Sequence, residues 1–238
     1  MTETRLRTVL ITGADRGLGY ALAARFVRGG FQVLAGARGA AGDRLAGLAQ
    51  PPHTVVVVPL DAADLGSIRQ AFQWARQVAP FVDILINNAG VHLESEVALE
   101  ALDLDDSYLA ATMAVNAFGP LRVTQQFLPL LERGQGKLIL NISSDAGSIA
   151  DCGGSREFAY CMSKAALNMQ SVILQRRVKD DGVKVLAIAP GWMRTEMGGA
   201  DADLDPSESA TGIMAVIAAN SDVDGPTYFD YAGKVWEW

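Results

Sequence analysis

The sequence has few of the residues that build metal sites and disulfide frameworks. Its 238 residues include two cysteines, Cys152 and Cys161, and two histidines, His53 and His92. The cysteines lack the spacing of metal ligands, and the histidines stand isolated along the chain. We therefore expect no bound metal, no zinc site and no scaffold stabilised by disulfide bonds.

Long apolar runs and clusters of positive charge are also missing. No apolar stretch reaches the roughly 18 residues of a membrane-spanning helix, and the first seven residues are polar, unlike a secretory signal. Lys and Arg number 20 against 27 Asp and Glu, which gives a net charge of −7. A protein that binds nucleic acid usually carries a basic cluster, and none occurs here. These features predict a cytoplasmic protein that binds neither membranes nor nucleic acid.

Short apolar, β-branched segments alternate with amphipathic ones along the whole chain, which predicts an α/β fold with a mainly parallel sheet. Because no linker or repeat interrupts the pattern, we expect residues 1–238 to form one domain, with a lid at about 192–206. The expected strands are 8–12, 32–37, 54–58, 82–86, 137–142, 184–189 and 227–229. The expected helices are 18–27, 64–79, 105–133, 159–178 and 206–220, the last capped by Ser207.

The first strand leads into a glycine-rich turn, residues 13–19, with the sequence GADRGLG. A helix and a second strand follow, and this order is typical of a dinucleotide-binding unit. Glycines let the backbone approach a pyrophosphate, and the free N–H groups at the helix N-terminus bind it. The spacing G-x-x-x-G-x-G differs from the common G-x-G-x-x-G, so its position between strand and helix carries the prediction.

Two arginines suggest which dinucleotide is bound. Arg38 follows the second strand, where an acidic residue would accept hydrogen bonds from a ribose 2′-hydroxyl, and Arg16 lies in the glycine-rich turn. Two guanidinium groups without a carboxylate suit a 2′-phosphate. We therefore expect NADP(H) to be preferred over NAD(H); the alternative is that both arginines are solvated surface residues. Asp61, after the third strand, is expected to contact the adenine.

The helix expected at 159–178 begins with the sequence AYCMSK. Tyr160 and Lys164 are four residues apart and should therefore lie on one face of this helix, one turn apart. A neighbouring ammonium favours the phenolate, which would allow Tyr160 to exchange a proton with a substrate oxygen. Ser143 and Ser144 follow the fifth strand, at the edge where open α/β sheets bind ligands.

The long helix expected at 105–133 contains Asn116 and Pro120. Proline has no N–H, so the carbonyl of Asn116 should lose its helical partner. A free carbonyl beside an amide side chain can hold an ordered water at the kink. Such a water would pass protons between Lys164 and solvent; the alternative is a bend with a structural role only.

Taken together and in order, these segments resemble the short-chain dehydrogenase/reductase family along nearly the whole chain. Further segments, among them 147–149, 163–169, 190–192 and the end from 229 to 238, resemble the branch that contains the sniffer-type carbonyl reductases and C-factor. The resemblance implies a Rossmann-like, doubly wound, three-layer fold with a mainly parallel seven-stranded sheet. The pieces that carry it are Thr12-Gly13, Gly17, Gly19, Asp61, Asn87-Asn88-Ala89-Gly90, Asn116, Ser144, Tyr160, Lys164, Pro190-Gly191 and Thr195.

The resemblance also implies a role for each matching residue. Tyr160 is the general acid in reduction, Lys164 lowers its pKa and binds the nicotinamide ribose, Ser144 binds the substrate carbonyl and Asn116 anchors the relay water. Ser143 is the less favoured alternative to Ser144. The residues implied to bind cofactor are Gly13, Asp15, Arg16, Gly17, Leu18, Gly19, Arg38, Asp61, Asn88, Ala89, Gly90, Tyr160, Lys164, Pro190, Gly191 and Thr195.

These features predict an NADPH-dependent oxidoreductase that reduces the carbonyl group of a small ketone, aldehyde or quinone. His92, Trp192 and Met193 are candidates to line the substrate pocket with Ser144, although each is as readily explained by packing. The family resemblance also implies a possible homodimer or homotetramer. One alternative is a cofactor-binding signalling protein of C-factor type. Another is a nucleotide-sugar epimerase, but that class expects a larger substrate-binding region than the chain after Gly191 provides.

Overall fold

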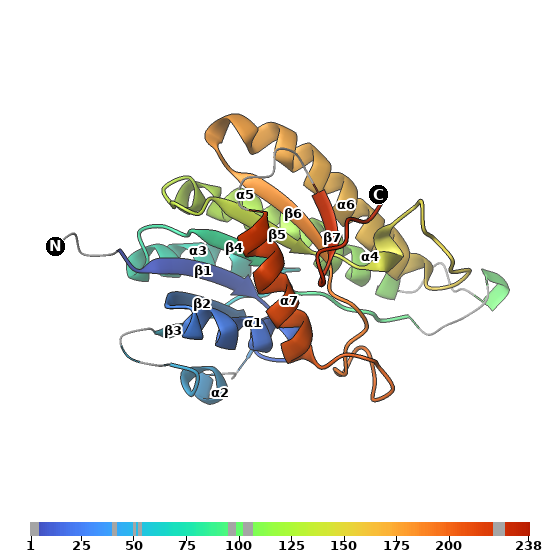
Figure 1. Ribbon diagram of the computed structural model, residues 1–238, viewed down its shortest axis with the longest axis horizontal. Helices are drawn as coiled ribbons and strands as arrows, with labels where there is room; N and C mark the ends of the chain where they lie inside the picture. The colour runs from blue at the N-terminus through green and yellow to red at the C-terminus, as the bar shows by residue number, and fades with distance from the viewer. Residues whose placement is uncertain are drawn as a thin grey trace.

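In a computed structural model, the chain forms one sheet of seven parallel strands in the order β3-β2-β1-β4-β5-β6-β7 (Figure 1). The structure describes residues 5–39, 42–49, 51, 54–94, 99–101, 107–220 and 227–238. The strands are β1 (Arg7–Thr12), β2 (Phe31–Ala37), β3 (Val55–Pro59), β4 (Ile84–Asn87), β5 (Leu138–Ile142), β6 (Lys184–Ala189) and β7 (Thr227–Asp230). The predicted doubly wound α/β fold is confirmed. The strand order reverses between β1 and β4, which opens a crevice at their carboxyl ends.

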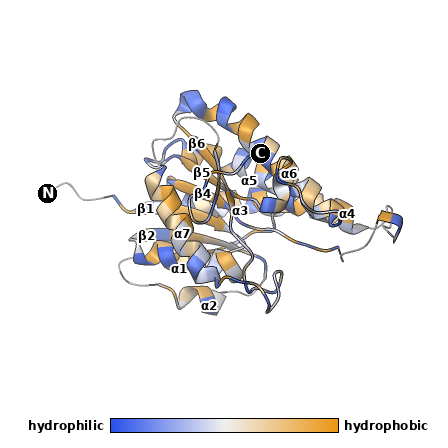
Figure 2. Cartoon of the chain, turned by 45° about the vertical axis from the view of Figure 1, so that its right-hand side comes forward, coloured by the Kyte–Doolittle hydropathy of each residue, from blue (hydrophilic) through white to orange (hydrophobic). Residues whose placement is uncertain are grey.

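Helices cover both faces of this sheet, because alternate side chains of each strand point to opposite sides. Val9 and Ile11 of β1 pack with helices α1 and α7, whereas Leu10 packs with α3 and α5. Figure 2 shows the strands as a largely hydrophobic layer between helices that carry hydrophilic residues. The α-helices are α1 (Gly17–Arg28), α2 (Gly42–Ala46), α3 (Leu65–Val78), α4 (Ser107–Met113), α5 (Gly119–Leu131), α6 (Phe158–Val178) and α7 (Pro206–Ala219).

Helix α6 forms where predicted, but it buries only some of its apolar residues. Met169 and Ile173 are 61% and 58% exposed, whereas Leu167 and Val178 are buried. Most residues on the buried side are polar, and Ser163, Lys164 and Asn168 are among them. Each of these three makes a hydrogen bond to another part of the chain, which offsets the cost of burying a polar group. Polar contacts therefore hold this helix against the sheet.

The segment predicted as one helix from 105 to 133 is interrupted. Residues 105 and 106 lie outside the described part of the chain. From Ser107 onward, α4 and α5 are separated by one π-helical turn, Ala114–Phe118, in which the N–H of Gly119 bonds the carbonyl of Ala114, five residues back. Pro120 at the start of α5 has no N–H to give the carbonyl of Asn116, which explains why the irregular turn lies here.

Two further details differ from the sequence predictions. Helix α7 is capped by Asp205 and not by Ser207: the Asp205 carboxylate accepts a hydrogen bond from the Ser207 N–H (2.8 Å), and Glu208 completes a capping box. The short helix α2 was not predicted. Within the described residues, no helix combines the length and the apolar character needed to cross a membrane.

Candidate active site

A cavity of about 1180 Å³ lies above the carboxyl ends of the strands. Nearly all the residues predicted for cofactor and substrate binding line it. They come from seven separate segments of the chain: Gly13, Asp15, Arg16, Gly17 and Leu18; Arg38; Asp61; Asn88, Ala89, Gly90 and His92; Ser143 and Ser144; Tyr160 and Lys164; and Pro190, Gly191, Trp192, Met193 and Thr195. Gly19 and Asn116 are the predicted residues that do not reach the cavity wall.

The glycine-rich turn shows why its glycines occur at these positions. Gly13 and Gly17 have φ angles of 64° and 51°, in the left-handed region that favours glycine. Gly19 packs beneath the turn, where a Cβ atom would lie 2.1 Å from the Gly13 carbonyl oxygen. No side chain caps the N-terminus of α1, so its first N–H groups lack a side-chain partner.

The two arginines lie at the cavity but differ in their surroundings. Arg38 follows β2 and is exposed, with no acidic residue beside it in the sequence. Arg16 pairs with Glu196 at 2.8 Å, and both side chains are more than half exposed. Such an exposed pair contributes at most about 1 kcal/mol. Arg16 therefore remains able to exchange this carboxylate for another anion.

Two asparagines at the end of β4, Asn87 and Asn88, join the segments around the cavity. The Asn88 amide donates to the carbonyls of Thr12 (2.9 Å) and Gly13 (3.1 Å), which fastens the β4 loop to the glycine-rich turn. Asn87 donates to Asn141 on β5 at 2.8 Å. These bonds fix the relative position of three strand ends.

Tyr160 and Lys164 both reach the cavity from the first turns of α6. The Lys164 Nζ atom lies 5.6 Å from the centre of the Tyr160 ring and donates a hydrogen bond to the Ile142 carbonyl at 2.9 Å. Complete burial lowers the pKa of Lys164 to about 8. Burial raises the pKa of Tyr160 to about 12, although a hydrogen bond with Ser144 acts in the opposite direction. This shift is opposite to the one expected from the Tyr160–Lys164 spacing, because burial penalises the phenolate more than neighbouring donors stabilise it.

The structure separates the roles of the two serines after β5. The Ser143 hydroxyl is buried and donates to the Asn168 side chain at 2.6 Å. Ser144 instead acts on Tyr160, where it lowers the pKa of the phenol. Its hydroxyl donates to Asp145 at 2.8 Å and accepts from the Ala146 N–H at 3.2 Å. Ser144 is thus the serine of the pair that interacts with the phenol.

Asn116 lies behind the cavity wall and not in it. Its amide oxygen accepts from the Val91 N–H, and its amide nitrogen donates to the Val91 carbonyl, both at 2.8 Å. A Cβ atom added to Gly90 would lie 3.5 Å from the Asn116 oxygen and 3.7 Å from the Lys164 nitrogen. Gly90 therefore lies between the side chains of Asn116 and Lys164. The relay water that Asn116 was expected to anchor stays a prediction.

The candidate substrate residues line the same cavity as Tyr160. The His92 ring lies 4.7 Å from the Tyr160 ring, and its Nε2 atom lies 3.0 Å from a Glu157 carboxylate oxygen. Trp192 is 54% exposed and donates its indole N–H to the Gly198 carbonyl at 2.8 Å. Met193 lines the cavity and also packs against the core.

Three residues at the site were not found by sequence reasoning. The Tyr228 hydroxyl donates to the Ser144 carbonyl, and burial raises the pKa of this phenol. Asp145 accepts from the Ser144 hydroxyl. Glu94 accepts from the backbone of α6. Nothing in the sequence around Tyr228 or Glu94 indicates that they belong to the site. Asp145 directly follows Ser144, and this position could have identified it as a site residue.

Comparison with known proteins agrees with this geometry. The family model described as short chain dehydrogenase matches residues 7–204. The chain is 38% identical over 157 residues to the protein named C-signal from Myxococcus xanthus, in an alignment covering 66% of this chain and 93% of that protein. A longer relative, the SDR family protein 7-like of Drosophila melanogaster, is 36% identical, and the alignment spans 58% of its length.

Solved structures share the fold over almost the entire chain. An NADPH-bound carbonyl reductase from chicken fatty liver is 31% identical with a TM-score of 0.87, covering 98% of this chain and all of that one. The carbonyl reductase Sniffer of D. melanogaster is 25% identical with a TM-score of 0.88 and the same coverage. The matched region includes the glycine-rich turn, Ser144, Tyr160 and Lys164. On this evidence, the chain belongs to the short-chain dehydrogenase family.

Proposed function

We propose that this protein is an NADPH-dependent carbonyl reductase that acts on a small ketone, aldehyde or quinone. The observation that carries the proposal is the arrangement of Tyr160: it shares one cavity with the Ser144 side chain, which lowers the pKa of the phenol, and with the buried amine of Lys164. A proton donor, a hydrogen-bond donor and a cation thus surround one point at the strand ends. A carbonyl oxygen that gains negative charge needs these three groups.

The residues present fit a phosphorylated dinucleotide. The uncapped N-terminus of α1 and the open glycine-rich turn suit a pyrophosphate. Arg38 and Arg16, which both line the cavity, suit a 2′-phosphate, and no acidic residue directly follows β2 to repel one. Pro190, Gly191 and Thr195 also line the cavity and would hold the nicotinamide. The similarity to an NADPH-bound carbonyl reductase supports the same choice.

The roles of the side chains follow from their protonation states. NADPH, when bound, supplies the hydride that the carbonyl carbon receives. Tyr160, with a pKa of about 12, keeps its proton at neutral pH and transfers it to the carbonyl oxygen as negative charge develops there. Ser144 orients the same oxygen by a hydrogen bond. Lys164, with a pKa of about 8, is mostly protonated at pH 7 and stabilises the phenolate that remains.

The test is reduction of a panel of aldehydes, ketones and quinones, followed by the loss of NADPH absorbance. Tyr160→Phe should lower kcat by about 100- to 10,000-fold, because it removes the general acid but keeps the ring. Tyr20→Phe is the matched control, since Tyr20 lies on α1 outside the cavity wall. Unchanged turnover in Tyr160→Phe would remove this residue from the mechanism.

A second candidate function is supported by one observation, the 38% identity to C-signal. In that case the protein would act as a cofactor-binding signalling protein whose turnover is incidental. The buried Lys164 and the Tyr160 phenol in the same cavity argue against this alternative, since binding alone does not need a proton donor. Tight NADPH binding without reduction of any carbonyl in the panel would favour it.

A further inference from the structure

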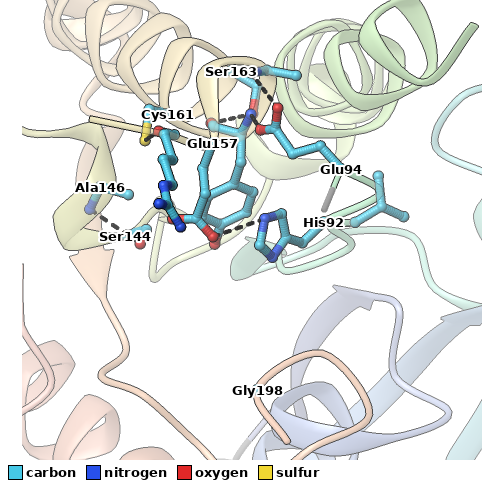
Figure 3. A network of polar contacts seen from close by, with 12 residues as sticks. His92, Glu94, Ser144, Ala146, Glu157, Cys161, Ser163 and Gly198 are labelled. Carbon is cyan, nitrogen blue, oxygen red and sulfur yellow. Dashed lines mark hydrogen bonds and ion pairs between the residues drawn. The ribbon is translucent and has the colours of Figure 1, made fainter. Parts of the chain in front are cut away.

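Glu94 makes an unusual contact with the helix that carries Tyr160. It follows β4 by a short loop, and only 8% of its surface is exposed. One carboxylate oxygen accepts from the Tyr160 N–H at 2.7 Å, and the other accepts from the Ala159 N–H at 3.1 Å. Figure 3 shows the side chain reaching the start of α6 from the neighbouring loop.

Helix α6 needs such a partner because its own sequence provides no cap. The first N–H groups of a helix have no partner within it. Glu157 stands at the capping position with a φ angle of 60° and makes no capping bond; its carboxylate pairs with His92 at 3.0 Å instead. A carboxylate at this end of the helix also interacts favourably with the helix dipole. Glu94 therefore supplies the cap from a distant part of the chain.

The short segment 91–94 is connected to Tyr160 by a second route, in addition to the Glu94 hydrogen bonds. The Val91 backbone is held on both sides by Asn116, whose amide also donates to the Ser163 hydroxyl at 3.0 Å. That hydroxyl donates in turn to the Tyr160 carbonyl at 2.7 Å. The segment begins directly after Gly90, a residue of the cavity wall. It thus links the cofactor side of the cavity to the turn that bears the phenol.

We propose that Glu94 is a positioning residue for carbonyl reduction: its buried carboxylate holds the first turn of α6 and thereby places the Tyr160 hydroxyl beside the substrate. The inference rests on the reductase function proposed above. It differs from a purely structural cap in one respect. A structural cap changes only stability, whereas a positioning residue changes the chemical step.

The test compares Glu94→Ala and Glu94→Gln with Asp64→Ala. Asp64 caps α3 through the Gly66 N–H at 2.8 Å and does not line the cavity, so its loss removes a cap without touching the site. Two properties are measured for each variant. Amide hydrogen exchange across residues 158–162 reports on the helix start and needs no substrate. Steady-state kinetics with NADPH and its 4-deuterated form report on hydride transfer.

In Glu94→Ala, the amides of Ala159 and Tyr160 should exchange at least about tenfold faster, because two charge-assisted hydrogen bonds are lost. The kcat should fall by about 10- to 100-fold as the phenol is displaced, with a larger deuterium isotope effect and little change in the KM for NADPH. Glu94→Gln should be intermediate, since its amide keeps one acceptor oxygen. Asp64→Ala should resemble wild type in both measurements.

Faster exchange with unchanged kcat would overturn the proposal and leave Glu94 a structural cap. Unchanged exchange would overturn it as well, because the contact would then not hold the helix. A fall in kcat equal to that of Asp64→Ala would show a general loss of stability and refute the positioning role. A wild-type protein that binds NADPH but reduces no carbonyl would refute the reductase function and the role of Glu94 in it, even if the exchange data established the cap.

Discussion

Replacing Lys164 with methionine should abolish activity. The difference in unfolding free energy between this variant and wild type should favour the variant more at pH 7 than at pH 10. The side chains have similar length, so the cavity keeps its shape. The amine is completely buried, and its environment lowers the pKa from 10.5 to about 8. Burial of this amine without a carboxylate partner is therefore a cost to folding.

The size and sign of this cost follow from the two pKa values. The folded pKa lies below the unfolded one, so the unfolded chain binds more protons between about pH 8 and 10.5 and the stability of wild type rises with pH in that window. At about 1.4 kcal/mol per pH unit, the buried ammonium costs about 3 kcal/mol at pH 7 and under about 1 kcal/mol at pH 10. Losing the bond to the Ile142 carbonyl adds a penalty of about 1–3 kcal/mol that does not depend on pH.

Urea unfolding of both proteins at pH 7 and pH 10, without cofactor, measures the effect. The free energy of unfolding of Lys164→Met minus that of wild type should be larger at pH 7 than at pH 10 by about 2–3 kcal/mol, because the lost hydrogen bond cancels between the two pH values. Lys234→Met, at an exposed position, controls for the removal of a positive charge. An equal difference at both pH values would refute the reasoning that burial suppresses protonation of Lys164.

Three further predictions concern separate parts of the site. Arg38→Ala should raise the Kd for NADPH by about tenfold and leave that for NADH unchanged, as measured by fluorescence titration, because a charged bond to the 2′-phosphate is lost; equal weakening of both would contradict this role. Gly19→Ala should destabilise the fold by about 3 kcal/mol or more in urea unfolding, since its Cβ would lie 2.1 Å from the Gly13 carbonyl, whereas Gly153→Ala, with open space around it, should not. Ser144→Ala should lower kcat by about 100-fold and Ser143→Ala should mainly lower stability; the reverse pattern would reassign the catalytic serine.

Most of the fold could be predicted from the sequence because buried parallel strands are continuous apolar runs. The six residues 184–189 were predicted with both ends correct, and the ends of the other strands are off by at most two residues. The sequence predictions were less accurate where two neighbouring side chains could fill the same role. Asp205 and Ser207 are both good capping residues, and only the chain direction at 205, with a ψ of 139°, selects the aspartate. For α6, periodicity identified a helix but not its buried face, on which most residues are polar.

The sequence by itself determined that Tyr160 and Lys164 lie one helical turn apart and that a glycine-rich turn precedes α1, because these relations depend on backbone geometry over a few residues. The tertiary structure decided the rest. Glu94 meets Tyr160 across 66 residues, and Tyr228 meets Ser144 across 84. Burial also decided that the pKa of Tyr160 rises to about 12. The energy of an ionised group depends on the solvent and donors around it, which only the assembled chain defines.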